Sequence, residues 1–175
     1  MKKTQSRAAA VARIAGARGK RLRAELMQQL QACFVRVQTW QQADKYVSAV
    51  ASDLPKRNGW TIAEHVGDRS PDRVQRLLNR AVWDTDKAIC VVRRFVVDGL
   101  SAAAGHRRRR GLVVGALDET GQQKRGTATC GVKRRYMGCA GRVDNGINTV
   151  HLSYVREGLG HGLIGFRQWI PAEQI

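Results

Sequence analysis

The feature that most constrains this chain is a short apolar run that ends in an acid. Residues 111–117 read Gly-Leu-Val-Val-Gly-Ala-Leu and lead directly into Asp118. An apolar segment of this length between glycines predicts a buried β-strand. A carboxylate at the tip of such a strand can ligate a divalent cation, because Mg²⁺ prefers hard oxygen ligands. The run therefore predicts a sheet-containing domain with Asp118 as a candidate metal ligand.

The chain carries a large excess of positive charge. Its 31 Lys and Arg against 14 Asp and Glu give a net charge of +17 at pH 7. This excess favours a polyanionic partner, most simply nucleic acid; a ribosome-associated or non-specifically adhesive basic protein is the alternative. Basic residues precede the first acid, Glu25, form the run Arg107–Arg110, and fill the acid-free stretch between Glu119 and Asp144. In that stretch the candidate phosphate contacts are Lys124, Arg125, Lys133, Arg134 and Arg135.

The cysteine, histidine and hydropathy patterns argue against a zinc-binding, redox or membrane-spanning protein. The four cysteines include no C-x-x-C pair, which argues against a zinc ribbon or a redox motif. The four histidines suggest no cluster. No segment offers the roughly 20 uninterrupted apolar residues of a membrane span, and the amino terminus lacks a signal-peptide core. A soluble cytoplasmic protein with no membrane partner is the prediction.

The order of patterns along the chain predicts an α+β protein. Residues 1–23 are rich in Ala, Arg and Gly without an acid, and predict a disordered or weakly helical basic arm. Residues 24–104 carry apolar side chains at helical spacing and predict a helical domain; a polar linker follows. Residues 111–175 contain three strand candidates, 112–117, 147–155 and 163–170, which suggest an antiparallel meander that begins a mixed sheet.

Within the helical region, residues 58–82 predict a helix-turn-helix unit. Trp60–Val66 is a short helix, and Ser70 with Pro71 can start a second one. Ala63 stands four residues before Gly67, a spacing that lets two helices cross closely. The second helix would carry its apolar residues on one face and the candidate DNA contacts on the other: Arg73, Gln75, Arg76, Asn79 and Arg80. An ordinary helical hairpin with a solvated basic face is the alternative.

Several motifs occur together in one order: Phe34-x-Arg36; Tyr46; Arg57-Asn58-Gly59-Trp60-x-x-Ala63-Glu64-x-x-Gly67-Asp68; residues 74–84; Asp118-Glu119-Thr120-Gly121-x-x-Lys124-x-Gly126; Tyr136-x-Gly138-x-Ala140-Gly141-Arg142-Val143-x-Asn145; and Ile170-Pro171. This series resembles the DDE-type transposases of the insertion-sequence 701 group. The resemblance implies a helical DNA-binding domain followed by a ribonuclease-H-like catalytic domain. DNA, in particular the inverted repeats at the ends of the element, is the implied partner, together with a second copy of the chain or a full-length transposase. It also implies a bacterial, nucleoid-associated protein.

In that family two Asp and one Glu bind two divalent ions, Mg²⁺ or Mn²⁺, and Asp118 would be the first of these acids. The series of motifs stops after the third strand candidate, before the second Asp and the Glu. None of the later acids, Asp144, Glu157 and Glu173, stands in a matching position. The resemblance thus predicts a truncated transposase that binds DNA and does not catalyse strand transfer by itself. A stand-alone DNA-binding regulator of the element and an inert remnant are the alternatives.

Overall fold

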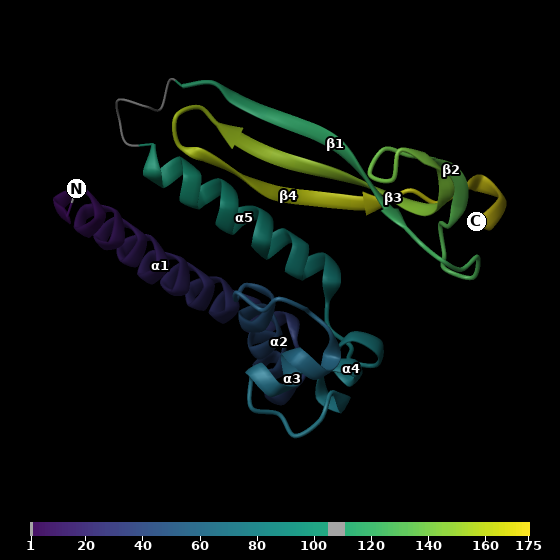
Figure 1. The fold of residues 1–175 in the computed structure, drawn as a ribbon, viewed down its shortest axis with the longest axis horizontal. Helices are drawn as coiled ribbons and strands as arrows, with labels where there is room; N and C mark the ends of the chain where they lie inside the picture. Colours follow the sequence, from purple (N-terminus) through teal and green to yellow (C-terminus); the bar gives the residue numbers. More distant parts are fainter. Residues whose placement is uncertain (1, 105–110) are drawn as a thin grey trace. The chain divides into compact units, whose positions relative to one another are not determined.

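The computed structural model describes residues 2–104 and 111–175 (Figure 1). In this part of the chain five α-helices are followed by a four-stranded antiparallel sheet, which confirms the α+β class. The run Arg107–Arg110 lies outside the described residues. The chain divides into two units, Met1–Val91 and Val92–Ile175. The division falls inside helix α5 (Thr85–Ala103), whereas the sequence predicts a boundary after this helix.

The amino-terminal basic segment belongs to helix α1, which spans Lys2–Leu30. The sequence predicts a disordered or weakly helical basic arm over residues 1–23, and in the structure residues 2–23 are part of this helix. The segment is rich in alanine and contains no proline, so the backbone can continue the helix that residues 22–30 begin on the core. The helix ends at a 3₁₀ turn, Gln31–Cys33.

Helix α2 (Val37–Val50) packs on the end of α1. The indole Nε1 of Trp40 donates a hydrogen bond to the Met27 carbonyl at 2.7 Å. Met27 is buried with residues of two later helices, Ala43 and Leu77, and Phe34 stacks obliquely on Trp83 with ring centroids 5.5 Å apart. These contacts join segments far apart in sequence into one helical core.

Helices α3 (Gly59–His65) and α4 (Asp72–Asn79) form the predicted pair of short helices. The Asn58 side chain caps α3, and Gly67 has a φ of 74°, a left-handed conformation that glycine adopts without strain. Ala63 is 2% exposed at the close approach. The sequence predicts Ser70 as the cap of α4 and Pro71 as its first residue. In the structure the helix begins one residue later, at Asp72, with Pro71 as its cap.

The predicted apolar face of α4 is only partly buried. Val74 and Leu77 lie in the core, but Leu78 and Val82 are 54% and 77% exposed. Leu78 points toward the border of the apolar stripe, and Val82 follows the end of the helix, so neither is covered.

The sheet is built around strand β3 (Arg142–Arg156), which pairs with β1 (Val113–Gln123) on one edge. Strands β2 (Lys133–Met137) and β4 (Gly160–Gln168) pair with its other edge, and a 3₁₀ turn, Ala172–Gln174, follows. The three predicted strands correspond to β1, β3 and β4. Strand β2 is an addition, because its basic sequence has no apolar alternation and becomes a strand by pairing with β3.

The second half of α5 lies against one face of the sheet (Figure 1). The Arg93 Nε donates to the Ile164 carbonyl at 3.1 Å. A Cβ on Gly162 would lie 2.6 Å from Val96, so the absence of a side chain at this position lets the helix approach β4. This packing explains why residues 92–103 belong to the unit that contains the sheet.

Candidate functional site

A positively charged groove is lined by residues of α2 and α4 in the amino-terminal unit. Five of its lining side chains are cationic, and no acid lines it among the residues that the structure describes. The polar lining residues Gln38, Thr39, Gln41 and Gln42 add hydrogen-bond donors. The cationic residues of the groove are Arg36, Lys45, Arg73, Arg76 and Arg80.

One buried carboxylate lies beside the groove and fixes two of these cations. The Asp68 side chain is 1% exposed and accepts hydrogen bonds from Gln42 Nε2 at 2.8 Å and Lys45 Nζ at 2.9 Å. Arg73 Nη1 lies 3.5 Å from the same carboxylate. Burial by itself raises the pKa of Asp68, but the hydrogen bonds from Lys45 and Gln42 outweigh it and hold the pKa below its usual value.

All five α4 residues predicted to contact DNA are exposed, and they separate into two sets. Arg73, Arg76 and Arg80 line the groove, whereas Gln75 and Asn79 do not. Arg76 and Arg80 form no ion pair with any residue in the described part of the chain. Sequence reasoning missed Arg36 and Lys45 as members of this site. Arg36 belongs to the Phe34-x-Arg36 motif, which was the one available signal.

The candidate metal ligand Asp118 lies in the middle of β1, not at the tip of a strand. Residues 119–123 continue the pairing with β3 as far as Gly146, so the strand extends beyond its apolar part. The sequence also predicts that this strand is buried, and this prediction is wrong. In the structure the Leu117 side chain is 71% exposed and Asp118 is exposed. On its outer edge β1 pairs with no other described strand, which leaves the backbone groups of that edge unpaired in the described part of the sheet.

Strand geometry separates Asp118 from its neighbouring acid. Asp118 is opposite His151 in the register, while Glu119 is opposite Val150 and accepts a hydrogen bond from Asn148 Nδ2 at 3.2 Å. Successive side chains of a strand point to opposite faces, so Asp118 and Glu119 cannot chelate one ion together. The described residues contain no group of three or more His, Cys, Asp or Glu able to hold a metal. The acids present therefore do not fit the two-metal site that the resemblance implies.

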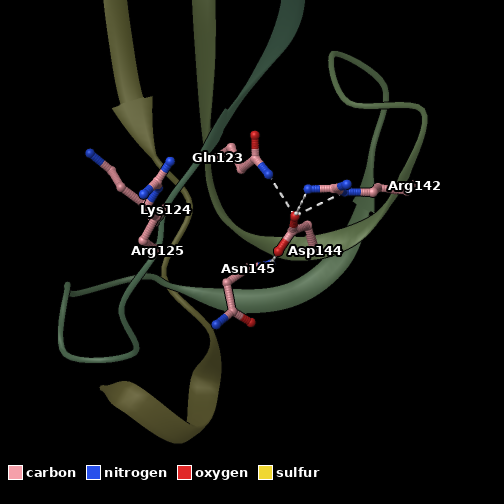
Figure 2. Close-up of a pocket in the computed structure, with 6 residues that line it drawn as sticks. All are labelled: Gln123, Lys124, Arg125, Arg142, Asp144 and Asn145. Atoms are coloured by element: carbon pink, nitrogen blue, oxygen red, sulfur yellow. Dashed lines mark hydrogen bonds and ion pairs between the residues drawn. The ribbon is translucent and has the colours of Figure 1, made fainter.

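A second hollow lies where β1 ends and β3 begins, and it is lined by Gln123, Lys124, Arg125, Arg142, Asp144 and Asn145 (Figure 2). Asp144 Oδ2 accepts from Gln123 Nε2 at 2.6 Å and from Arg142 Nη2 at 3.0 Å. The Asn145 backbone N–H also donates to Asp144, and with the Gln123 and Arg142 hydrogen bonds it lowers the pKa of this carboxyl. The side chains of Lys124 and Arg125 extend away from Asp144 in Figure 2. Asp144 thus orders the hollow without neutralising these two cations.

The remaining predicted phosphate contacts, Lys133, Arg134 and Arg135, lie on β2 and differ in whether another side chain already contacts their charged group. Lys133 Nζ lies 2.6 Å from Glu173 Oε1. The Arg135 guanidinium lies 4.2 Å from the ring centre of Trp169. Arg134 is exposed and forms no ion pair with the described residues. Arg135 is therefore held within its own unit by a cation–π contact.

Known proteins resemble this chain over most of its length. The family model described as "DDE superfamily endonuclease" matches residues 29–174. The chain is 29% identical over 124 residues to the "Probable transposase for insertion sequence element IS701" of Microchaete diplosiphon, an alignment that covers 71% of this chain and 30% of that protein. No solved structure matches the chain significantly.

Within residues 2–104 and 111–175, the helices lack the length and continuous apolar character that a membrane span requires.

The family match covers most of the chain, including both the α2–α4 groove and the strand with Asp118. The ordered motifs predicted this relationship, and the comparison confirms it. This chain belongs to the DDE superfamily endonucleases.

Proposed function

We propose that this chain is the DNA-binding part of an insertion-sequence transposase and takes part in DNA transposition by binding the ends of the element. The observation that supports this most strongly is the α2–α4 groove, where five cations meet without a lining acid among the described residues. Since surplus cations at a surface attract phosphates and release their counterions, such a groove favours a nucleic acid over a neutral partner. The α3–α4 pair would act as the helix-turn-helix unit, with α4 as its recognition helix.

The catalytic part of the proposal is limited to Asp118. Its carboxylate suits Mg²⁺ or Mn²⁺, but one exposed carboxylate whose acidic neighbour faces away does not make a two-metal site. We infer that this polypeptide does not cleave DNA by itself. Cleavage would require acids supplied by another polypeptide or by a longer form of the protein, since the chain spans 30% of the length of its relative.

Binding to labelled duplexes at increasing salt, followed by fluorescence anisotropy, tests the function. We expect the 175-residue chain to bind duplex DNA with an affinity that falls steeply with salt, and to prefer the inverted repeats of its element over a mixed-sequence duplex. Absence of duplex binding at low salt would refute the proposal. A cleavage assay with Mg²⁺ and with Mn²⁺ should show no product.

The division of the chain into two units favours a second function, in which the chain is a stand-alone DNA-binding regulator of the element. The groove lies entirely in the unit Met1–Val91, which has its own buried core, while Asp118 lies in the other unit. Such a protein would occupy inverted repeats and exclude the full transposase. Inhibition of transposition by the catalytically silent chain would support the regulator.

A further inference from the structure

The α2–α4 groove combines cations from two separate parts of the sequence and leaves two polar residues of α4 outside it. We propose that this groove seats the sugar-phosphate backbone of duplex DNA, with Arg36 and Lys45 as phosphate contacts, while Gln75 and Asn79 read base edges beside it. The inference rests on the proposed DNA-binding function and divides that function between two surfaces.

The helical periodicity of α4 separates these two surfaces. At about 100° per residue, Arg73, Arg76 and the capping Arg80 fall within one sector of about 60°. Gln75, Leu78 and Asn79 fall within a second sector, centred roughly 140° away from the first. The first sector faces the groove and the second does not. One helix therefore presents a cationic stripe and a polar stripe to different parts of a ligand.

The length of the cationic stripe suits a nucleic-acid strand. The seven-residue step from Arg73 to Arg80 rises about 10 Å, and one strand of duplex DNA carries a phosphate about every 3.4 Å along the axis. Because the strand winds around the axis, its phosphates lie farther apart in space than along the axis, so the stripe can contact roughly two of them. Arg36, which caps the start of α2, and Lys45, in the second half of the helix, extend the contact along the facing wall.

The electrostatics of the groove favour phosphate as its occupant. Asp68 holds Lys45 and Arg73, so these two cations are positioned before a ligand arrives. In the described part of the chain Arg36, Arg76 and Arg80 have no ion-pair partner that a phosphate would have to displace. Thr39 and Gln41 can donate further hydrogen bonds to phosphate oxygens.

The chemistry of the second surface suits bases in the major groove. Gln75 and Asn79 stand one helical turn apart and are exposed, and either amide can pair with adenine N6 and N7. Leu78 lies between them in sequence, is 54% exposed, and can contact a thymine methyl.

Salt titrations of the 175-residue chain test whether the groove, and not the Gln75–Asn79 surface, binds the phosphates. The probe is a labelled mixed-sequence duplex, and the variants are Arg36→Ala and Lys45→Ala. Lys56→Ala is the matched control, because it removes the same charge from an exposed position outside the groove. We expect the slope of log affinity against log salt to flatten by about 0.9 for each groove variant and to stay unchanged for the control. Circular dichroism verifies that each variant is folded.

Sequence preference is read separately, by selecting bound duplexes from a random pool. We expect Gln75→Ala and Asn79→Ala to weaken enrichment of the preferred sequence while leaving the salt slope unchanged. Equal slopes for Arg36→Ala and the parent chain, or equal flattening by Lys56→Ala, would overturn the groove assignment while duplex binding itself persists. Failure of the parent chain to bind any duplex would instead refute the proposed function.

An RNA duplex of the same sequence provides the last comparison. Its deep, narrow major groove excludes an α-helix, so α4 cannot place Gln75 and Asn79 on base edges there. We expect weaker binding to the RNA. Equal affinity for both duplexes would overturn the assignment of these two side chains to base reading.

Discussion

Lys45 Nζ lies 2.9 Å from Asp68 Oδ1, and this contact connects α2 to the turn between α3 and α4. The carboxylate is almost completely buried, while the Lys45 side chain is 40% exposed. Gln42 of the same helix donates to the other oxygen, Oδ2. A single carboxylate therefore fixes the position of the turn relative to the wall of the groove.

Asp68→Asn should destabilise the amino-terminal unit. The amide keeps the volume of the carboxylate but loses the charge that Lys45 and Arg73 face. We expect the free energy of unfolding to fall by about 1–3 kcal/mol, measured by urea denaturation with circular dichroism. The exposed Asp53→Asn serves as the control and should stay within about 0.5 kcal/mol of the parent. Equal effects of the two variants would contradict the role of Asp68.

The same carboxylate predicts a pH dependence. Since the pKa of Asp68 is lowered on folding, its stabilisation is complete above the ordinary value of 3.8 and is lost as the pH falls through the lower, folded-state pKa. The difference in unfolding free energy between the parent and Asp68→Asn should therefore shrink as the solution is acidified below that value. A difference that remains constant down to the acid limit would show that Asp68 stabilises the fold without its charge.

Arg76→Ala should weaken duplex binding without changing the fold, because this side chain is exposed and forms no ion pair with the described residues. We expect the salt slope to flatten by about 0.9 for the lost phosphate contact, and Arg80→Ala to behave alike. Anisotropy titrations at several salt concentrations provide the measurement. Slopes identical to that of the parent would dismiss Arg76 and Arg80 as phosphate contacts.

Asp118→Ala should leave duplex binding nearly intact, since Asp118 lies on β1, in a different unit from the groove. We also expect the parent chain to show no Mg²⁺-dependent cleavage of a labelled duplex. If the purified parent cleaved DNA and Asp118→Ala abolished the reaction, the inference that this chain is catalytically silent would be wrong.

Gly162→Ala should destabilise the packing of α5 on the sheet. The added Cβ would lie 2.6 Å from Val96 Cγ1, so the helix or the strand must shift. We expect a loss of about 1–3 kcal/mol in unfolding free energy, which Val96→Ala should partly restore in the double variant. Gly126→Ala is the control, because a Cβ added there would meet open space out to 4 Å. No rescue by Val96→Ala would argue against this contact.

Much of the fold was accessible from sequence because the signals were local. Apolar residues at helical spacing predicted the helices, and the spacing of Ala63 and Gly67 predicted the close pair α3–α4, since both depend on side chains within one or two turns. The ordered motifs identified the family. Strand β2 could not be predicted this way, because its basic residues become a strand only when β3 offers a pairing edge.

The sequence by itself determined the helices from residue 24 onward, three of the four strands, the excess of positive charge and the family. Only the tertiary structure decided that Arg36 and Lys45 join the α4 arginines around one groove, and that Asp68 holds two of these cations. It also decided that Asp118 and Glu119 face opposite sides of a strand that continues past the apolar run. The physical reason is that composition and periodicity act over a few residues, whereas a site depends on contacts between segments that only the folded chain brings together.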